Sequence, residues 1–159
     1  MTTQHDEPAY DLVGSDTLII RRVVGVILVN AQGEVLLQQR DDKPDLAYPG
    51  YWTLFGGHVE DGEATDDAIR RELREELRIG LPLHFWWSYK CPVRTIPDKL
   101  MTINHVYVGY MIHDVATLTL YEGQAMAYFT PTAAAQVTLA FEQSKVLAKF
   151  FAEREGLGL

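Results

Sequence analysis

The chain has 159 residues, 47% of them hydrophobic and 23% charged, which favours one globular domain with its own core. The net charge of -8 disfavours nonspecific nucleic-acid binding, and no apolar run is long enough to span a membrane. Cys91 is the only cysteine, which excludes an internal disulfide and a multi-cysteine zinc site and fits a cytoplasmic location. We predict an N-terminal extension at residues 1–16 and a single domain at 17–159.

The first predicted elements are strands. The segment 17–29 is rich in Ile and Val, and 34–39 alternates between apolar and polar residues. The turn signal Asn30-Ala31-Gln32-Gly33 joins these two segments into a predicted hairpin. A short strand at 51–55 then leads into Gly56-Gly57.

A helix is predicted after these glycines. Thr65 is a good N-cap, and Asp66 and Asp67 suit the positive end of the helix dipole. The helix is expected to run to about Leu77 and to be stopped by Gly80.

The second half of the chain is predicted to add three strands and a final helix. The segment 83–90 alternates, which places Leu83, Phe85, Trp87 and Tyr89 on one face. The later elements are a loop at 92–99, strands at 100–112 and 125–130, a helical turn at 131–136 and a helix at 141–154. This order predicts an α/β (α+β) fold in which a mixed β-sheet is packed between α-helices.

The segment 57–78 concentrates eight acids and four arginines. Glu72, Glu75 and Glu76 follow i, i+3, i+4 spacing, so they project from one side of the predicted helix. An apolar stripe of Ile69, Leu73 and Leu77 lies beside them. Three carboxylates this close repel one another, and a bound divalent cation would remove the conflict. Oxygen ligands suit Mg²⁺ or Mn²⁺ rather than zinc.

The spacing of these residues resembles the Nudix box. Gly57 is followed after five residues by Glu63, and after seven more by Arg71-Glu72-Leu73-Arg74-Glu75-Glu76. The resemblance implies a Nudix-like fold. It also implies metal-dependent cleavage of a pyrophosphate linkage in a nucleoside diphosphate joined to another group. The usual glycine after the glutamate pair is Arg78 here, so Gly80 is expected to close the helix instead.

The resemblance also implies a role for each matching residue. The metal ligands would be Glu72, Glu75, Glu76 and the carbonyl of Gly56. Arg71 would orient Glu75 or another box carboxylate, and Glu63 would brace the loop that starts at Gly57 against the helix. Outside the box, Glu122 is the candidate catalytic base or additional metal ligand. Arg40 is the candidate contact to a substrate phosphate.

Simpler interpretations stand beside these roles. The box glutamates could form a solvated, salt-bridged helix face, Glu122 could be an exposed turn acid, and Arg40 a surface charge. Trp86 is expected to pack under a helix or at a dimer contact rather than to stack on a base. His105 is expected to be a satisfied buried histidine, and Cys91 a small residue without a chemical role.

Three functions compete. The first is a pyrophosphohydrolase acting on a small-molecule nucleoside diphosphate derivative, with no nucleic-acid or membrane partner. The second is a catalytically silent nucleotide-binding or regulatory module, which would have no need of the complete glutamate set. The third is an isomerase of isoprenoid diphosphates, which needs a thiol opposite a carboxylate, and Cys91 is not where we expect one. The resemblance to the Nudix family is also compatible with a homodimer.

Overall fold

The computed structural model describes residues 19–92 and 100–157. The predicted extension at 1–16 and most of the predicted loop at 92–99 lie outside these residues. The strands are β1 (Ile19–Val29), β2 (Val35–Gln39), β3 (Trp52–Thr53), β4 (Phe55–His58), β5 (Leu83–Pro92), β6 (Leu100–Tyr110) and β7 (Ala125–Phe129). The helices are α1 (Thr65–Leu77), the 3-10 helix η1 (Val115–Thr117), α2 (Pro131–Ala134) and α3 (Gln143–Leu157). No helix in the described part of the chain is long and apolar enough to cross a membrane.

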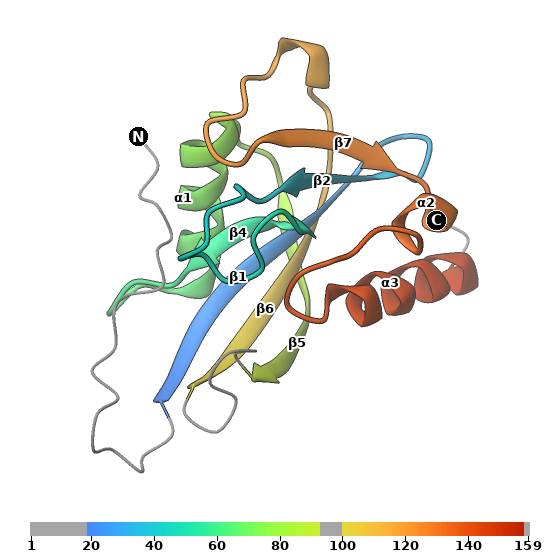
Figure 1. Ribbon diagram of the computed structural model, residues 1–159. Coiled ribbons are helices and arrows are strands. Elements are labelled where there is room, and N and C mark those ends of the chain that lie inside the picture. Colours follow the sequence, from blue (N-terminus) through green and yellow to red (C-terminus); the bar gives the residue numbers. More distant parts are fainter. Residues whose placement is uncertain (1–18, 93–99, 158–159) are drawn as a thin grey trace.

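The strands form one mixed sheet. Its main order is β3-β2-β1-β6-β5, with β4 paired to β1 and β7 paired to β2. The central pair, β1 and β6, runs parallel, and the other pairings are antiparallel. In Figure 1, α1 lies on one side of the sheet and α3 on the other. The predicted fold class, a mixed sheet between helices, is therefore confirmed.

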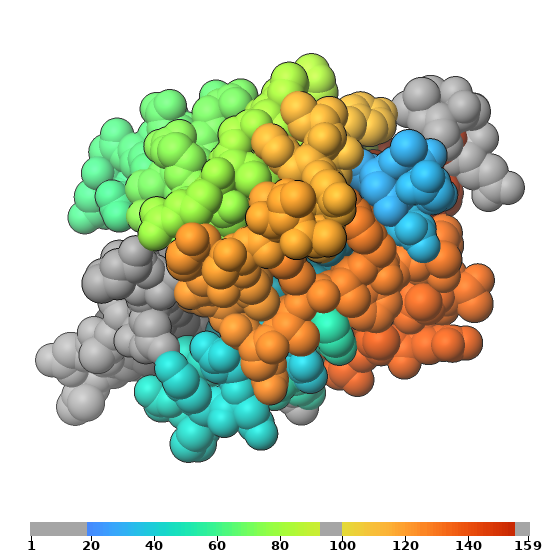
Figure 2. All heavy atoms as spheres, turned by 90° about the horizontal axis from the view of Figure 1, so that it is seen from above, coloured from blue at the N-terminus to red at the C-terminus, as the bar shows by residue number. Residues whose placement is uncertain are grey.

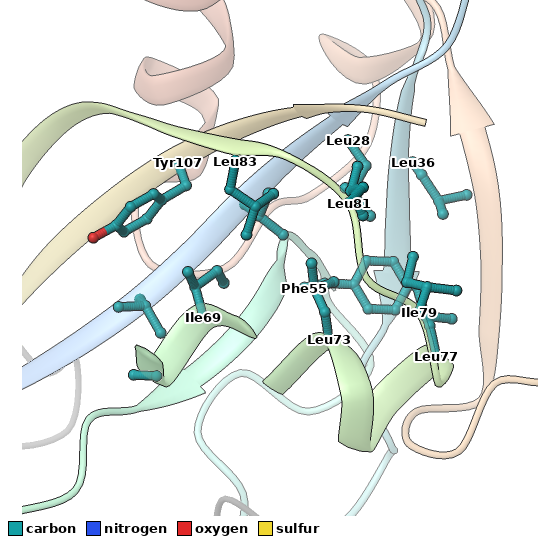
Figure 3. Packing of buried hydrophobic residues seen from close by; sticks show 13 residues of the cluster. Leu28, Leu36, Phe55, Ile69, Leu73, Leu77, Ile79, Leu81, Leu83 and Tyr107 are labelled. Carbon is teal, nitrogen blue, oxygen red and sulfur yellow. The ribbon is translucent and has the colours of Figure 1, made fainter. Parts of the chain in front are cut away.

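Each face of the sheet carries its own apolar core. On one face, Ile69, Leu73 and Leu77 of α1 pack with Phe55, as Figure 3 shows. On the other face, the α3 residues Val146, Leu147 and Phe150 are buried against the sheet. Packing on the sheet therefore fixes the position of α1, because burial of its apolar stripe orients the whole helix.

The predicted hairpin between β1 and β2 is confirmed, with Val29 opposite Val35. The Asn30 side-chain oxygen accepts hydrogen bonds from the backbone N–H groups of Gln32 and Glu34, at 3.1 and 2.9 Å. Gly33 has a φ of 78°, which glycine adopts without steric cost.

The prediction that β5 has one uninterrupted apolar face is wrong. A bulge shifts the β5–β6 register between Phe85 and Trp87, so the alternation of side chains changes face there. Phe85 packs edge-on to Tyr107 on the α1 side of the sheet. Trp87 stacks on Tyr89 and joins the α3 side.

The predicted end of α1 at Leu77 is confirmed, whereas the predicted N-cap and the predicted closing residue are corrected. The N-cap is Ala64, which makes no side-chain capping bond, and Thr65 is the first helical residue. The Thr65 hydroxyl instead hydrogen-bonds the Tyr107 hydroxyl of β6, at 2.7 Å. At the other end, Arg78 and not Gly80 closes the helix.

The closing residue has a left-handed backbone. Arg78 has φ 57° and ψ 36°, and its N–H donates to the Arg74 carbonyl at 3.1 Å. A left-handed helical conformation costs a non-glycine residue about 1–2 kcal/mol. The chain therefore has an arginine in a strained backbone conformation at the position where the Nudix box has a glycine.

Replacing Leu73 by alanine should lower the free energy of unfolding by about 3 kcal/mol, because it leaves a cavity between α1 and the sheet. Leu73 is 1% exposed. Arg74→Ala is the matched control, because Arg74 is exposed on the same helix, and it should change stability by less than about 0.5 kcal/mol. Urea denaturation measures both, and equal losses would contradict the packing described here.

Candidate active site

A cleft of about 980 Å³, its open mouth included, lies beside α1 and β4. Its walls come from β1, β2, β4, β6, α1, the segment before β7 and the start of α3. Glu76, Gly56, Gly57, Glu122 and Arg40 all line it. The fold therefore brings five residues singled out in the sequence to one cleft.

Two of the three helix carboxylates are completely buried. Glu72 and Glu76 have no exposed surface, although they lie beside the apolar residues of the same helix face. Because they are one helical turn apart, both are carried inward by the packing of Leu73 and its apolar neighbours. Glu75 lies at the edge of this face, with its side chain 23% exposed.

The glycines of β4 allow the backbone to approach these carboxylates. A Cβ on Gly57 would lie 2.5 Å from Glu72 Oε1, which is closer than real Cβ atoms come to other groups. A Cβ on Gly56 would lie 1.9 Å from the Val24 carbonyl oxygen of β1. Gly56 is therefore required by space, because a side chain there would meet the backbone of β1. A side chain at Gly57 would instead displace the Glu72 carboxylate, so Gly57 makes the cradle that holds this group.

Arg71 is the centre of the charged contacts. Its Nε and Nη2 donate to Glu63 Oε2 and Oε1, both at 2.8 Å, in a two-pronged pairing. Its Nη1 donates to Glu72 Oε1 at 2.9 Å and to Glu75 Oε2 at 3.4 Å. The hydrogen bonds that Arg71 donates to Glu63 raise the pKa of the Arg71 guanidinium above its usual range, with Glu72 adding to the effect.

Glu63 ties the loop between β4 and α1 to this arginine. Its carboxylate accepts a hydrogen bond from the Glu60 backbone N–H at 3.0 Å, while Arg22 Nη2 donates to the Glu63 carbonyl at 3.1 Å. Arg71 Nη2 also donates to the His58 carbonyl at 3.0 Å. The Arg71 hydrogen bond lowers the pKa of Glu63. These are the contacts that a bracing role for Glu63 requires.

The acidic residues suit a hard divalent cation by their chemistry. Glu72, Glu75 and Glu76 offer only oxygen atoms, the donors that Mg²⁺ and Mn²⁺ prefer, and Gly57 makes room for one of these carboxylates. Among residues 19–92 and 100–157, no three His, Cys, Asp or Glu side chains already form a metal-binding group. Glu72 and Glu75 are turned toward Arg71 instead.

The two candidates outside the box also face the cleft. Glu122 lies in the segment just before β7, where Gly123 has a φ of 82°. Arg40 follows β2; its Nε donates to the Ala47 carbonyl at 2.8 Å, and its guanidinium lies 5.3 Å from the Phe141 ring centre.

Sequence reasoning missed the uncharged polar residues of the cleft. Gln38, Asn104 and Gln143 are 6–7% exposed and line it. Gln143 Oε1 accepts hydrogen bonds from the Leu54 N–H and the Thr53 hydroxyl, at 2.9 and 3.1 Å. One feature of the sequence could have indicated a polar cleft: Thr102 and Asn104 are polar residues at alternate, inward-facing positions of a predicted strand.

Two aromatic expectations have different outcomes. Trp86 packs edge-on to Phe150 of α3 and donates from Nε1 to Glu153 Oε2 at 2.6 Å, so the prediction of packing under a helix is confirmed. His105 lies outside the cleft lining. Its Nε2 is buried without a hydrogen-bond partner among the described residues, so the prediction of a satisfied histidine is wrong. Burial lowers the pKa of His105 and so favours its neutral form.

Cys91 does not line the cleft that contains Glu76. It is 1% exposed, and its thiol contacts the Pro92 carbonyl oxygen. Burial raises the pKa of Cys91 to about 12, and the nearby Glu142 adds to this shift. This arrangement does not support the isomerase, which needs a thiol opposite a carboxylate of the site.

Comparison with known proteins places the chain in one family. The NUDIX domain model matches residues 19–150. A nucleoside triphosphatase, NudI of Escherichia fergusonii, is 33% identical over 135 residues, which cover 80% of this chain and 94% of the relative. Among solved structures, the MutT protein of Methanosarcina mazei Go1 superposes with a TM-score of 0.75 at 22% identity, covering 88% of this chain and 99% of that one. The ORF135 protein of E. coli gives 0.70 at 31% identity, covering 86% and 92%.

The chain therefore belongs to the NUDIX domain family. Its class is that of the Nudix pyrophosphohydrolases, enzymes that generally use divalent metal ions.

Gly57→Ala should reduce turnover about 100-fold while the protein stays folded, because the added Cβ displaces the Glu72 carboxylate and small misplacements in a site are costly. Gly80→Ala is the control, because nothing lies within 4 Å of a Cβ added there. Hydrolysis assays and circular dichroism measure the two effects. A Gly57→Ala protein with normal turnover would show that this cradle is not needed.

Glu63→Gln should remove a contribution to the free energy of unfolding that the wild-type protein loses at low pH. Because Arg71 lowers the Glu63 pKa in the folded protein, the stabilisation is complete above the ordinary value of 4.5 and is lost as the pH falls through the folded pKa. The difference in unfolding free energy between wild type and variant should therefore be constant from pH 7 to about 5 and shrink below it. Denaturation at several pH values measures this, with the exposed Asp61→Asn as control. A difference that does not change with pH would contradict the Arg71–Glu63 contact.

Proposed function

We propose that the protein hydrolyses the pyrophosphate linkage of a nucleoside diphosphate joined to another group, with Mg²⁺ or Mn²⁺ as cofactor. Nucleoside triphosphates are the proposed substrate class. The observation that carries this proposal is that the buried carboxylate of Glu76 lines the same cleft as Gly56, Gly57 and Glu122. The substrate class rests on the relative that is named a nucleoside triphosphatase.

The residues proposed to hold the cation are Glu72, Glu75, Glu76 and the carbonyl of Gly56. When bound, a divalent cation supplies polarisation of phosphate oxygens and a lower pKa for the attacking water. Burial of Glu72 and Glu76 supports the assignment, because buried carboxylates need positively charged partners and a divalent cation would supply charge in addition to that of Arg71, which donates to Glu72.

The other charged residues have proposed roles in positioning and proton transfer. Arg71 holds the carboxylates in place, since one guanidinium joins the helix to Glu63 and to Glu72. Glu122 accepts the proton of the attacking water, which its place in the cleft supports. Arg40 brings a positive charge to the cleft and is proposed to bind a substrate phosphate.

The neutral polar residues of the cleft are proposed to bind the nucleobase. Gln38 Oε1 is buried and has no hydrogen-bond partner among the described residues, so it is available to accept from a base amino or imino group. The two hydrogen bonds to Gln143 Oε1 fix the orientation of that amide, which leaves its nitrogen as a donor. Amides offer both donors and acceptors, so this wall can read the edge of a base. A homodimer and a cytoplasmic location stay predictions.

Purified protein with Mg²⁺ or Mn²⁺ should hydrolyse at least one nucleoside triphosphate in a panel that also contains nucleotide sugars, ADP-ribose and dinucleoside polyphosphates. Glu76→Gln should reduce turnover at least about 100-fold, because it removes a carboxylate from the cleft. Asp67→Asn is the matched control, since Asp67 is an exposed acid of the same helix, and it should keep wild-type turnover. Released phosphate or pyrophosphate is measured by enzyme coupling.

Two results would count against the proposal. Wild-type turnover in Glu76→Gln would mean that the carboxylate in the cleft has no role in the reaction. Thermal stabilisation by nucleotides without turnover of any of them would instead indicate the nucleotide-binding module.

A further inference from the structure

Arg78 contacts the segment that carries Glu122. Its guanidinium lies 4.5 Å from the centre of the Tyr121 ring, within the range of a cation–π interaction. The Tyr121 backbone N–H also donates to the Glu76 carbonyl at 3.0 Å. Two independent contacts therefore join Tyr121 to the last turn of α1.

The other side of Glu122 is attached to β2. The Gln124 backbone N–H donates to the Gln39 carbonyl at 2.9 Å, and its side-chain Nε2 donates to the Arg40 carbonyl at 2.8 Å. A Cβ on Gly123 would lie 2.7 Å from the Gln39 carbonyl oxygen, so the backbone passes close to β2 there. Glu122 is thus held between one anchor on α1 and another on β2.

These contacts hold the segment between β6 and β7 against two elements of the site, α1 and β2. Figure 2 shows the light-orange chain between β6 and β7 lying against the green chain of α1 and the segment after it. Of the two anchors, the one on β2 uses backbone and amide groups. The one on α1 combines the backbone hydrogen bond to Glu76 with a side-chain contact from Arg78. A glycine at position 78 would close the helix without strain and would offer no such contact.

We propose that Arg78 is a positioning residue: its stack on Tyr121 fixes the segment Tyr121–Gln124, so that Glu122 stays in the cleft opposite Glu76. The proposal rests on the proposed function of Glu122 as the base. It gives a reason for the strained arginine at the end of α1, because the left-handed residue both closes the helix and holds the neighbouring segment.

The test compares Arg78→Gly, which keeps a favourable helix end and removes the stack, with Arg74→Ala, an exposed arginine one turn earlier. Arg78→Gly should lower kcat about tenfold with KM nearly unchanged, because misplacing a catalytic group affects the chemical step more than binding. Tyr121→Leu should have the same effect, and the double variant should be no worse than either single variant. Arg78→Lys and Tyr121→Phe, which keep a cation and a ring, should retain most of the activity.

Repeating Arg78→Gly in a Glu122→Gln background separates this inference from the proposed function. There the arginine substitution should have no further effect on kcat, because the group that it positions is already removed. A loss in wild type that persists unchanged in the Glu122→Gln background would overturn the inference, as would normal kcat in Arg78→Gly. Normal kcat in Glu122→Gln would overturn both this inference and the role of Glu122 as base, while the Glu76→Gln assay still judges the hydrolase itself.

Amide hydrogen exchange gives a readout that needs no substrate. The N–H groups of Tyr121 and Gln124 should exchange faster in Arg78→Gly than in wild type or Arg74→Ala, while those inside α1 keep their protection. Unchanged exchange at Tyr121 would show that the stack does not hold the segment, and would overturn the inference even if no substrate were found.

Discussion

Burial of two carboxylates on one helix is the constraint on which the rest of the site depends. Glu72 and Glu76 have no exposed surface, yet their helix is held on the sheet by apolar packing. Such groups are costly to bury without positive or hydrogen-bonding partners. Arg71 supplies one, and Glu63 holds Arg71 in turn with a two-pronged pairing. Gly57 leaves the space that the Glu72 carboxylate occupies. The residues of the box therefore act as one unit, since each makes the position of another possible.

Local patterns predicted most of the fold. The hairpin, the mixed sheet and the apolar stripe of α1 follow from turn chemistry and periodicity, which depend on neighbouring residues alone. The errors occur where distant contacts decide the outcome. The Thr65 hydroxyl hydrogen-bonds Tyr107 of β6 rather than its own helix, and the β5 bulge is defined only by pairing with β6. Neither partner could be inferred from the short segment in question.

The candidate site also has one part that follows from a local segment and another that depends on distant contacts. The contacts of Arg71 with Glu63 and Glu72 lie within one segment, and the resemblance of that segment to the Nudix box implied that Arg71 orients a box carboxylate and that Glu63 braces the loop. The wall of buried amides does not lie within one segment, because Gln38, Asn104 and Gln143 come from three separate elements and meet only in the folded chain. The left-handed conformation of Arg78 was also not predicted. Glycine is the residue expected to adopt that conformation, and Gly80 lies only two residues further on.

The parallel pairing of β1 with β6 has a consequence for how the chain folds. It matches Ile19 with Leu100 and continues to Val29 with Tyr110, so the middle of the sheet joins segments roughly 80 residues apart. The β1–β2 hairpin and α1 are local and can form early, whereas the central pairing must wait for a long loop to close. Until β6 arrives, β1 presents an unpaired apolar edge to other chains, and such edges promote aggregation. Folding yield should therefore depend on protein concentration more than the stability of the finished domain does.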